Sequence, residues 1–139
     1  VKDDDFYLLD FEGEPESTIR DRKVKQPPLK DIAGLFRSFH YAVYATIFNH
    51  MEDYAYSQED LFLAGEILYR YFIGVFLETY VSLIQEHNIN IGYRQERIFL
   101  LEYCMLEKAV YELGYEMNSR PRWAVIPLQG IMSIINETN

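Results

Sequence analysis

The pattern of apolar and polar positions divides the chain into a short N-terminal extended segment and a longer helical part. Residues 5–11 alternate in polarity and are rich in aromatic and aliphatic side chains. This pattern predicts one β-strand within residues 1–11, either alone or as half of a hairpin. Residues 12–28 contain three prolines, a glycine and a run of charged side chains, which predicts a loop with one helical turn near 16–23.

From Leu29 onward, apolar residues recur at spacings of three and four, which is typical of helices that bury one face. Ser57 and Asp60 form a capping pair in front of the second helix. Asn88, Asn90 and Gly92 interrupt the pattern and separate the second helix from the third. The expected helices are about 29–49, from the Ser57 cap to about 87, 93–117 and 127–135. The sequence therefore predicts a mainly α fold, with a bundle of about four helices over residues 29–136.

Composition and charge restrict the class of protein. The 139 residues fit one domain or part of one, and 12 Tyr with 9 Phe supply ample core material. A net charge of -9 disfavours nucleic acid and anionic lipid, whose phosphates would repel the chain. No uninterrupted apolar run reaches about 18 residues, so we expect no membrane span. The single Cys104 excludes an internal disulfide, and we expect a cytoplasmic protein cut from a larger one.

The first candidate site is the run from Asp10 to Pro15. Asp10 ends the predicted strand, Glu12 follows two residues later, and Gly13 permits a tight turn. A carboxylate at the end of a strand can present an oxygen ligand to Mg²⁺, as it does in phosphotransferases. An Asp-x-Glu sequence is also a common turn former, so both interpretations remain open at this point.

The second candidate site is the C-terminal part of the third predicted helix. Its apolar stripe gives way to tyrosines, carboxylates and one ammonium group, whose directed donors and acceptors suit sugar hydroxyls. Tyrosine rings can also face the apolar side of a pyranose. The alternative is a solvated helix face with weak i,i+4 pairing. The candidate residues are Lys108, Tyr111, Glu112, Tyr115, Glu116 and Asn118, followed by Arg120 and Trp123.

The remaining chemistry-bearing residues carry weaker hypotheses. The three histidines His40, His50 and His87 lack the spacing of metal ligands. We expect His40 to be a core histidine inside the first helix and Cys104 to be a small buried hydrophobe.

Four segments together resemble one protein family. In order and spacing they are similar to the C-terminal part of maltokinases, many of which are fused to trehalose synthase. The resemblance covers nearly the whole chain, although residues 50–95 contribute little to it. The segments are Tyr7–Pro15, Pro28–Ala42, Glu107–Trp123 and Ile126–Ile131.

The resemblance implies a fold and an activity for the parent protein. The family has a bilobed kinase-like fold, of which this chain would be the helical C-terminal lobe with one N-terminal strand. Its members transfer the γ-phosphoryl group of ATP to maltose, which gives maltose 1-phosphate for glycogen synthesis. Asp10 would then bind Mg²⁺ with Glu12 as a second candidate, and the segment from Lys108 to Trp123 would contact maltose. Asp31 and Arg37 would be structural.

The same resemblance implies what the parent must supply. The catalytic Asp, the nucleotide-binding N-terminal lobe and, in fused proteins, a trehalose synthase domain would lie outside this chain. We therefore expect no catalytic residue here, no tightly bound cofactor and no kinase activity of the isolated chain. Two alternatives remain, namely a kinase-like lobe that acts on another sugar and a non-catalytic helical scaffold of a trehalose synthase.

Overall fold

The computed structural model describes residues 18–53 and 55–137, and these residues are mainly α-helical. The helices are α1 (Ile19–Lys23), α2 (Pro28–His50), α3 (Gln58–Glu86), α4 (Arg94–Ser119) and α5 (Val125–Glu137). Two short 3₁₀ turns, Met51–Asp53 and Pro121–Ala124, follow α2 and α4. The predicted strand within residues 1–11, together with Asp10 and Glu12, lies outside the described residues.

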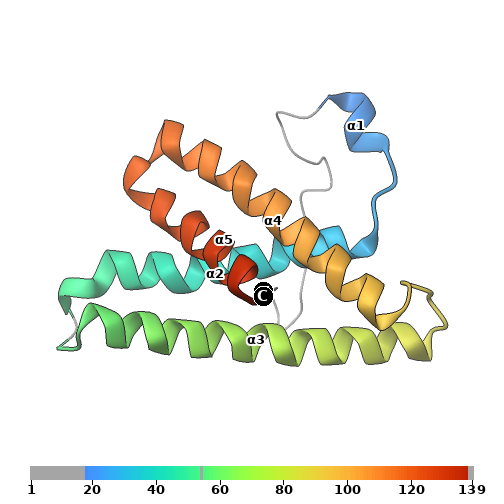
Figure 1. Ribbon diagram of the computed structural model, residues 1–139, viewed down its shortest axis with the longest axis horizontal. Coiled ribbons are helices and arrows are strands. Elements are labelled where there is room, and N and C mark those ends of the chain that lie inside the picture. The colour runs from blue at the N-terminus through green and yellow to red at the C-terminus, as the bar shows by residue number, and fades with distance from the viewer. Residues whose placement is uncertain (1–17, 54, 138–139) are drawn as a thin grey trace, which may run out of the picture.

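α2 is the central helix of the described fold. Pro28 occupies its first turn, where a missing N–H costs nothing. Its apolar stripe packs against α3 on one side and against α4 and α5 on the other (Figure 1). Leu29, Ile32 and Phe36 form the core of the N-terminal half, and Tyr44 and Ile47 join Ile126 of α5 in the C-terminal half.

α3 begins as the sequence predicts. The Ser57 side chain accepts a hydrogen bond from the Asp60 backbone N–H (3.1 Å), so it caps the first turn. Gly65 faces α2, where a Cβ atom would lie 2.7 Å from Ile47 Cδ1. The missing side chain therefore lets the two helices approach closely.

α4 and α5 form an antiparallel helical pair that crosses α2 (Figure 1). The turn between α3 and α4 uses two left-handed residues, Asn88 (φ 54°) and Gly92 (φ 84°). The Tyr93 backbone N–H then donates to Glu96 Oε2 (2.8 Å) at the start of α4. The third and fourth predicted helices are thus present, with ends within about two residues of those expected.

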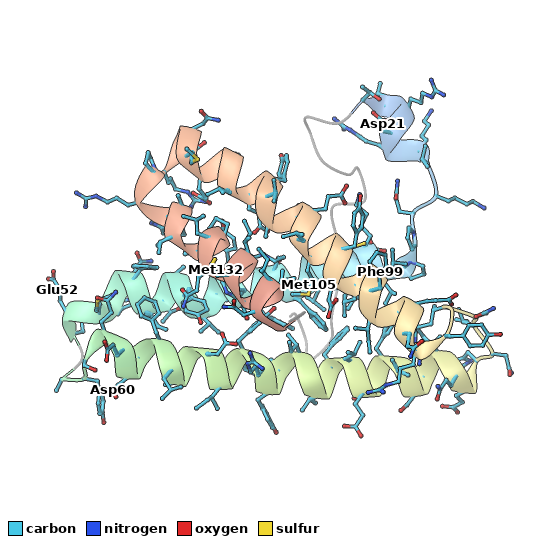
Figure 2. All side chains as sticks on the ribbon, in the orientation of Figure 1. Asp21, Glu52, Asp60, Phe99, Met105 and Met132 are labelled. Atoms are coloured by element: carbon cyan, nitrogen blue, oxygen red, sulfur yellow. The ribbon has the colours of Figure 1, made fainter. Side chains whose placement is uncertain are left out.

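Among the described elements, α3 differs in composition from what our expectation about membranes assumes. Over an 18-residue window its mean hydropathy is 1.4, so within residues 18–53 and 55–137 this helix is long and apolar enough to cross a bilayer. Only 11% of the window is buried, and side chains along the outer edge of α3 point away from the molecule (Figure 2). Core helices of soluble proteins pass the same test of length and composition. The match by itself therefore places no helix in a membrane.

Candidate functional site at the C-terminal end of α4

The predicted sugar-binding residues occupy the last three turns of α4 and the 3₁₀ turn that follows. The structure divides them into two groups. Glu112 and Glu116, one turn apart, face α2 and are withdrawn from solvent. Tyr111 and Tyr115 lie on the exposed side of the same turns.

Glu112 is tied to Arg37 of α2. Arg37 Nε donates a hydrogen bond to Glu112 Oε2 (2.8 Å), and Nη2 lies 2.7 Å from the same oxygen. The Nη2 hydrogens are not directed at that oxygen, so Nη2 contributes an ion-pair contact without a hydrogen bond. The Arg37 side chain is 1% exposed and that of Glu112 is 13% exposed. Burial raises the pKa of Glu112, and the nearby Arg37 guanidinium opposes this rise.

Gly130 of α5 makes room for the Arg37 guanidinium. A Cβ atom on residue 130 would collide with Arg37 Nη1 and lie 3.0 Å from Cζ. Gly130 is itself buried, so α5 closes the guanidinium from behind. Three helices therefore meet at this one side chain.

Glu116 is 2% exposed and its carboxylate is well satisfied. Tyr41 of α2 donates its hydroxyl to Oε1 (3.2 Å). Arg120 donates through Nε to Oε2 (2.9 Å) and through Nη2 to Oε1 (2.6 Å), which is a bidentate contact. Burial, followed by the charges of Glu112 and Glu116, raises the pKa of Tyr41, so this hydroxyl keeps its proton.

Arg120 connects this buried carboxylate to the indole of Trp123. The Arg120 Cζ atom lies 4.3 Å from the centroid of the Trp123 ring, which is a cation–π arrangement. Trp123 also packs against the core cluster of Tyr44, Ile47 and Ile126. Trp123 is therefore anchored on the core, while its partner Arg120 remains half exposed.

The helix end also carries two exposed tyrosines and a partly buried lysine. Tyr111 and Tyr115 are 37% and 49% exposed. Lys108 Nζ lies 5.2 Å from the centroid of the Tyr111 ring. Asn118 turns back along its own helix and donates to the Gly114 carbonyl (2.9 Å). The surface available to a ligand is thus aromatic and cationic, and Asn118 takes part in it less directly than the sequence predicts.

Sequence reasoning missed two residues of this arrangement and understated a third. Tyr41 and Gly130 lie within two of the segments named above, but no role could be assigned to them, because their contacts join helices far apart in the chain. Arg37 was expected to be structural, and it is the only charged residue buried on the apolar face of α2. The sequence signal for this contact was a positive charge within an otherwise apolar stripe, because a buried charge requires a partner of opposite sign.

A separate cleft of about 400 Å³ lies on the other side of Arg37, between α2, α3, α4 and α5. Met105, labelled in Figure 2, belongs to its α4 wall. The cleft shares Arg37 and Gly130 with the contact described above. None of the predicted sugar-binding residues lines it. His40 lies on its floor, and burial together with the Arg37 charge lowers the pKa of His40 to about 3. His40 is therefore a neutral core histidine at neutral pH, as the sequence predicts.

The structure also bears on the cysteine and on the predicted metal site. Cys104 is buried, and burial raises the pKa of its thiol, in agreement with the expected small hydrophobe. Among residues 18–53 and 55–137, no three His, Cys, Asp or Glu side chains come together in an arrangement that could hold a metal ion. The predicted magnesium ligands lie outside this part of the chain.

No protein-family model matches the chain.

Proposed function

We propose that this chain is the helical C-terminal part of a cytoplasmic maltokinase, and that the end of α4 holds the disaccharide. The observation that supports the proposal most directly is the division of this helix end. Its carboxylates anchor it to α2, while Tyr111 and Tyr115 are exposed and the partly buried Lys108 lies beside the Tyr111 ring. Aromatic rings beside a cation suit the apolar face and the hydroxyls of a sugar.

In this proposal the residues of the helix end bind and orient maltose so that its anomeric hydroxyl points at the γ-phosphorus of ATP. Correct orientation is a major part of catalysis in phosphoryl transfer. Asp10, with Glu12 as a second candidate, would bind the Mg²⁺ that accompanies ATP. That assignment rests on the sequence resemblance, as does the catalytic Asp expected outside this chain.

The proposal is tested by assaying ATP-dependent phosphorylation of maltose by the full protein that contains this chain. We expect maltose 1-phosphate as the product, and we expect Tyr111→Ala and Tyr115→Ala each to raise the KM for maltose about tenfold, equivalent to about 1.4 kcal/mol of binding. Tyr103→Ala is the matched control, since Tyr103 is an exposed tyrosine earlier in the same helix. Phosphorylation of a different sugar alone, or equal KM values for all three variants, would overturn the assignment.

The metal assignment has its own test in the same assay. Asp10→Asn should depress kcat strongly with little change in the KM for maltose, because it would remove a ligand to Mg²⁺ without touching the sugar. An unchanged kcat would refute this role. The isolated 139-residue chain should show no phosphorylation above background, since it lacks the expected catalytic Asp.

A further inference from the structure

We propose that Arg37, seated against Gly130, is a positioning residue that fixes the orientation of the sugar-binding end of α4. This inference rests on the proposed function of that helix end. It assigns to α2 and α5 an indirect part in substrate binding, which acts through the side chain of Arg37.

The first step is the cost of burying Arg37. A guanidinium that is 1% exposed requires a partner, because an uncompensated buried charge is strongly destabilising. Glu112 supplies that partner through one oxygen, 2.8 Å from Nε and 2.7 Å from Nη2. The position of the Glu112 carboxylate is therefore fixed relative to α2.

The second step is the matched spacing of two contacts between α2 and α4. Arg37 and Tyr41 are four residues apart on α2, and their partners Glu112 and Glu116 are four residues apart on α4. Two contacts one helical turn apart fix both the rotation of α4 about its axis and its shift along α2. Tyr111, adjacent to Glu112 in the chain, takes its direction from that rotation.

The third step is the space behind the guanidinium. Gly130 lies so close to Arg37 that an added Cβ would collide with Nη1 and lie 3.3 Å from Nη2. The atoms that this Cβ would contact lie at the end of the long Arg37 side chain. An added methyl group would therefore push the guanidinium toward Glu112 before it moved the backbone. α5 thus determines where the charge of Arg37 sits, and any side chain at residue 130 disturbs it.

The test uses Gly130→Ala in the full protein, with Gly34→Ala as the matched control. Gly34 lies on α2, one turn before Arg37, and a Cβ there meets nothing within 4 Å. We expect Gly130→Ala to raise the KM for maltose at least fivefold while the KM for ATP stays within twofold of wild type. Gly34→Ala should leave both unchanged. If Gly130→Ala lowers the melting temperature but leaves the KM for maltose unchanged, Gly130 has a purely structural role and the proposal is overturned.

A double-mutant cycle shows whether the effect passes through Arg37. Arg37→Met and Gly130→Ala should be non-additive in their effects on the KM for maltose. The reason is that Gly130→Ala acts only by displacing the Arg37 side chain, which Arg37→Met has already removed. Additive effects would contradict the proposal.

A second pair of variants covers the case in which Gly130→Ala does not fold. Glu112→Gln keeps the shape of the side chain and weakens its contact with Arg37. Glu107→Gln is its control, because Glu107 forms a different and exposed α2–α4 ion pair with Lys30 (3.2 Å). We expect only Glu112→Gln to raise the KM for maltose. If wild type phosphorylates maltose but Glu112→Gln behaves like its control, the positioning role alone is overturned. If wild type does not phosphorylate maltose, the proposed function and this inference both fall.

Discussion

At the scale of single residues, the fold depends on a few polar side chains on one face of α2, three of them buried and Tyr41 partly buried. Arg37, His40, Tyr41 and Tyr44 follow one another along about two turns of that helix. Each is held differently. Arg37 and Tyr41 contact carboxylates of α4, Tyr44 donates to Glu66 Oε2 of α3 (3.0 Å), and His40 lies among aromatic rings. Their separate environments predict separate responses to mutation and to pH.

His40 should make the protein sensitive to acid. Its pKa is lowered from 6.5 to about 3 in the folded state, so the unfolded chain binds the proton more readily between these values. The contribution of His40 to the free energy of unfolding is therefore fully present above pH 6.5. It decreases by about 1.4 kcal/mol per pH unit as the pH falls from there toward about 3. Urea unfolding of wild type and His40→Gln between pH 7 and pH 4 measures this. The variant should show a shallower decline, and equal slopes would contradict the assignment.

Tyr41 should contribute to stability through its contact with a buried carboxylate. Tyr41→Phe removes the donor to Glu116 while Arg120 continues to satisfy that side chain. Because hydrogen bonds to charged groups are among the stronger ones, we expect a loss of about 1.5 kcal/mol in the free energy of unfolding. Thermal unfolding measures it, with the exposed Tyr56→Phe as control. Equal melting temperatures of the two variants would show that the contact contributes nothing.

At the scale of helices, the sequence predicted most of what the structure contains. The apolar spacing located α2, α3, α4 and α5, and the Ser57 cap marked the start of α3. These features are local, since they depend on residues within a turn or two of one another. The helical turn expected near 16–23 is present as α1. The close contact between α2 and α3 at Gly65 could not be predicted, because it depends on how two helices cross.

Two glycines of α3 should respond in opposite directions to the same substitution. Gly65→Ala places a methyl group against Ile47 and Val43, and the overpacking outweighs the gain in helix propensity, so we expect a loss of about 1 kcal/mol. Gly74→Ala meets nothing within 4 Å and should stabilise the protein by about 0.5–1 kcal/mol. Chemical denaturation of both variants measures the difference. A stabilised Gly65→Ala variant would show that the helices separate without cost.

At the scale of the whole molecule, the most unusual feature is the apolar outer surface of α3. Leu63, Ile67, Tyr71 and Val75 are all exposed and succeed one another at intervals of four residues. Such a continuous apolar stripe is uncommon on a monomeric protein and promotes association.

The isolated chain should therefore self-associate. Sedimentation velocity over a hundredfold range of concentration should show a rising average mass, and Ile67→Lys with Tyr71→Lys should reduce it. Val24→Lys, an exposed apolar position outside α3, serves as the control. Monomeric behaviour across the whole range would contradict the prediction. Flotation of the chain with neutral phosphatidylcholine vesicles would instead favour a membrane-bound α3.

The candidate site was predictable only in part. The sequence brought together the polar residues of α4, because they lie on successive turns of one helix. It assigned Glu112 and Glu116 to the sugar along with the tyrosines, whereas the structure turns both carboxylates toward α2. A helix pattern shows which residues share a face, but it does not show which face another helix will cover.

The sequence by itself determined that the chain is mainly helical and where its long helices begin and end. These properties follow from interactions within one or two turns of the chain. Only the tertiary structure decided that Arg37, Glu112 and Gly130, from three different helices, share one buried contact. That contact exists because helix packing removes water from the Arg37 guanidinium, which then requires a carboxylate partner. The partner lies on a distant helix, so no local sequence pattern could identify it.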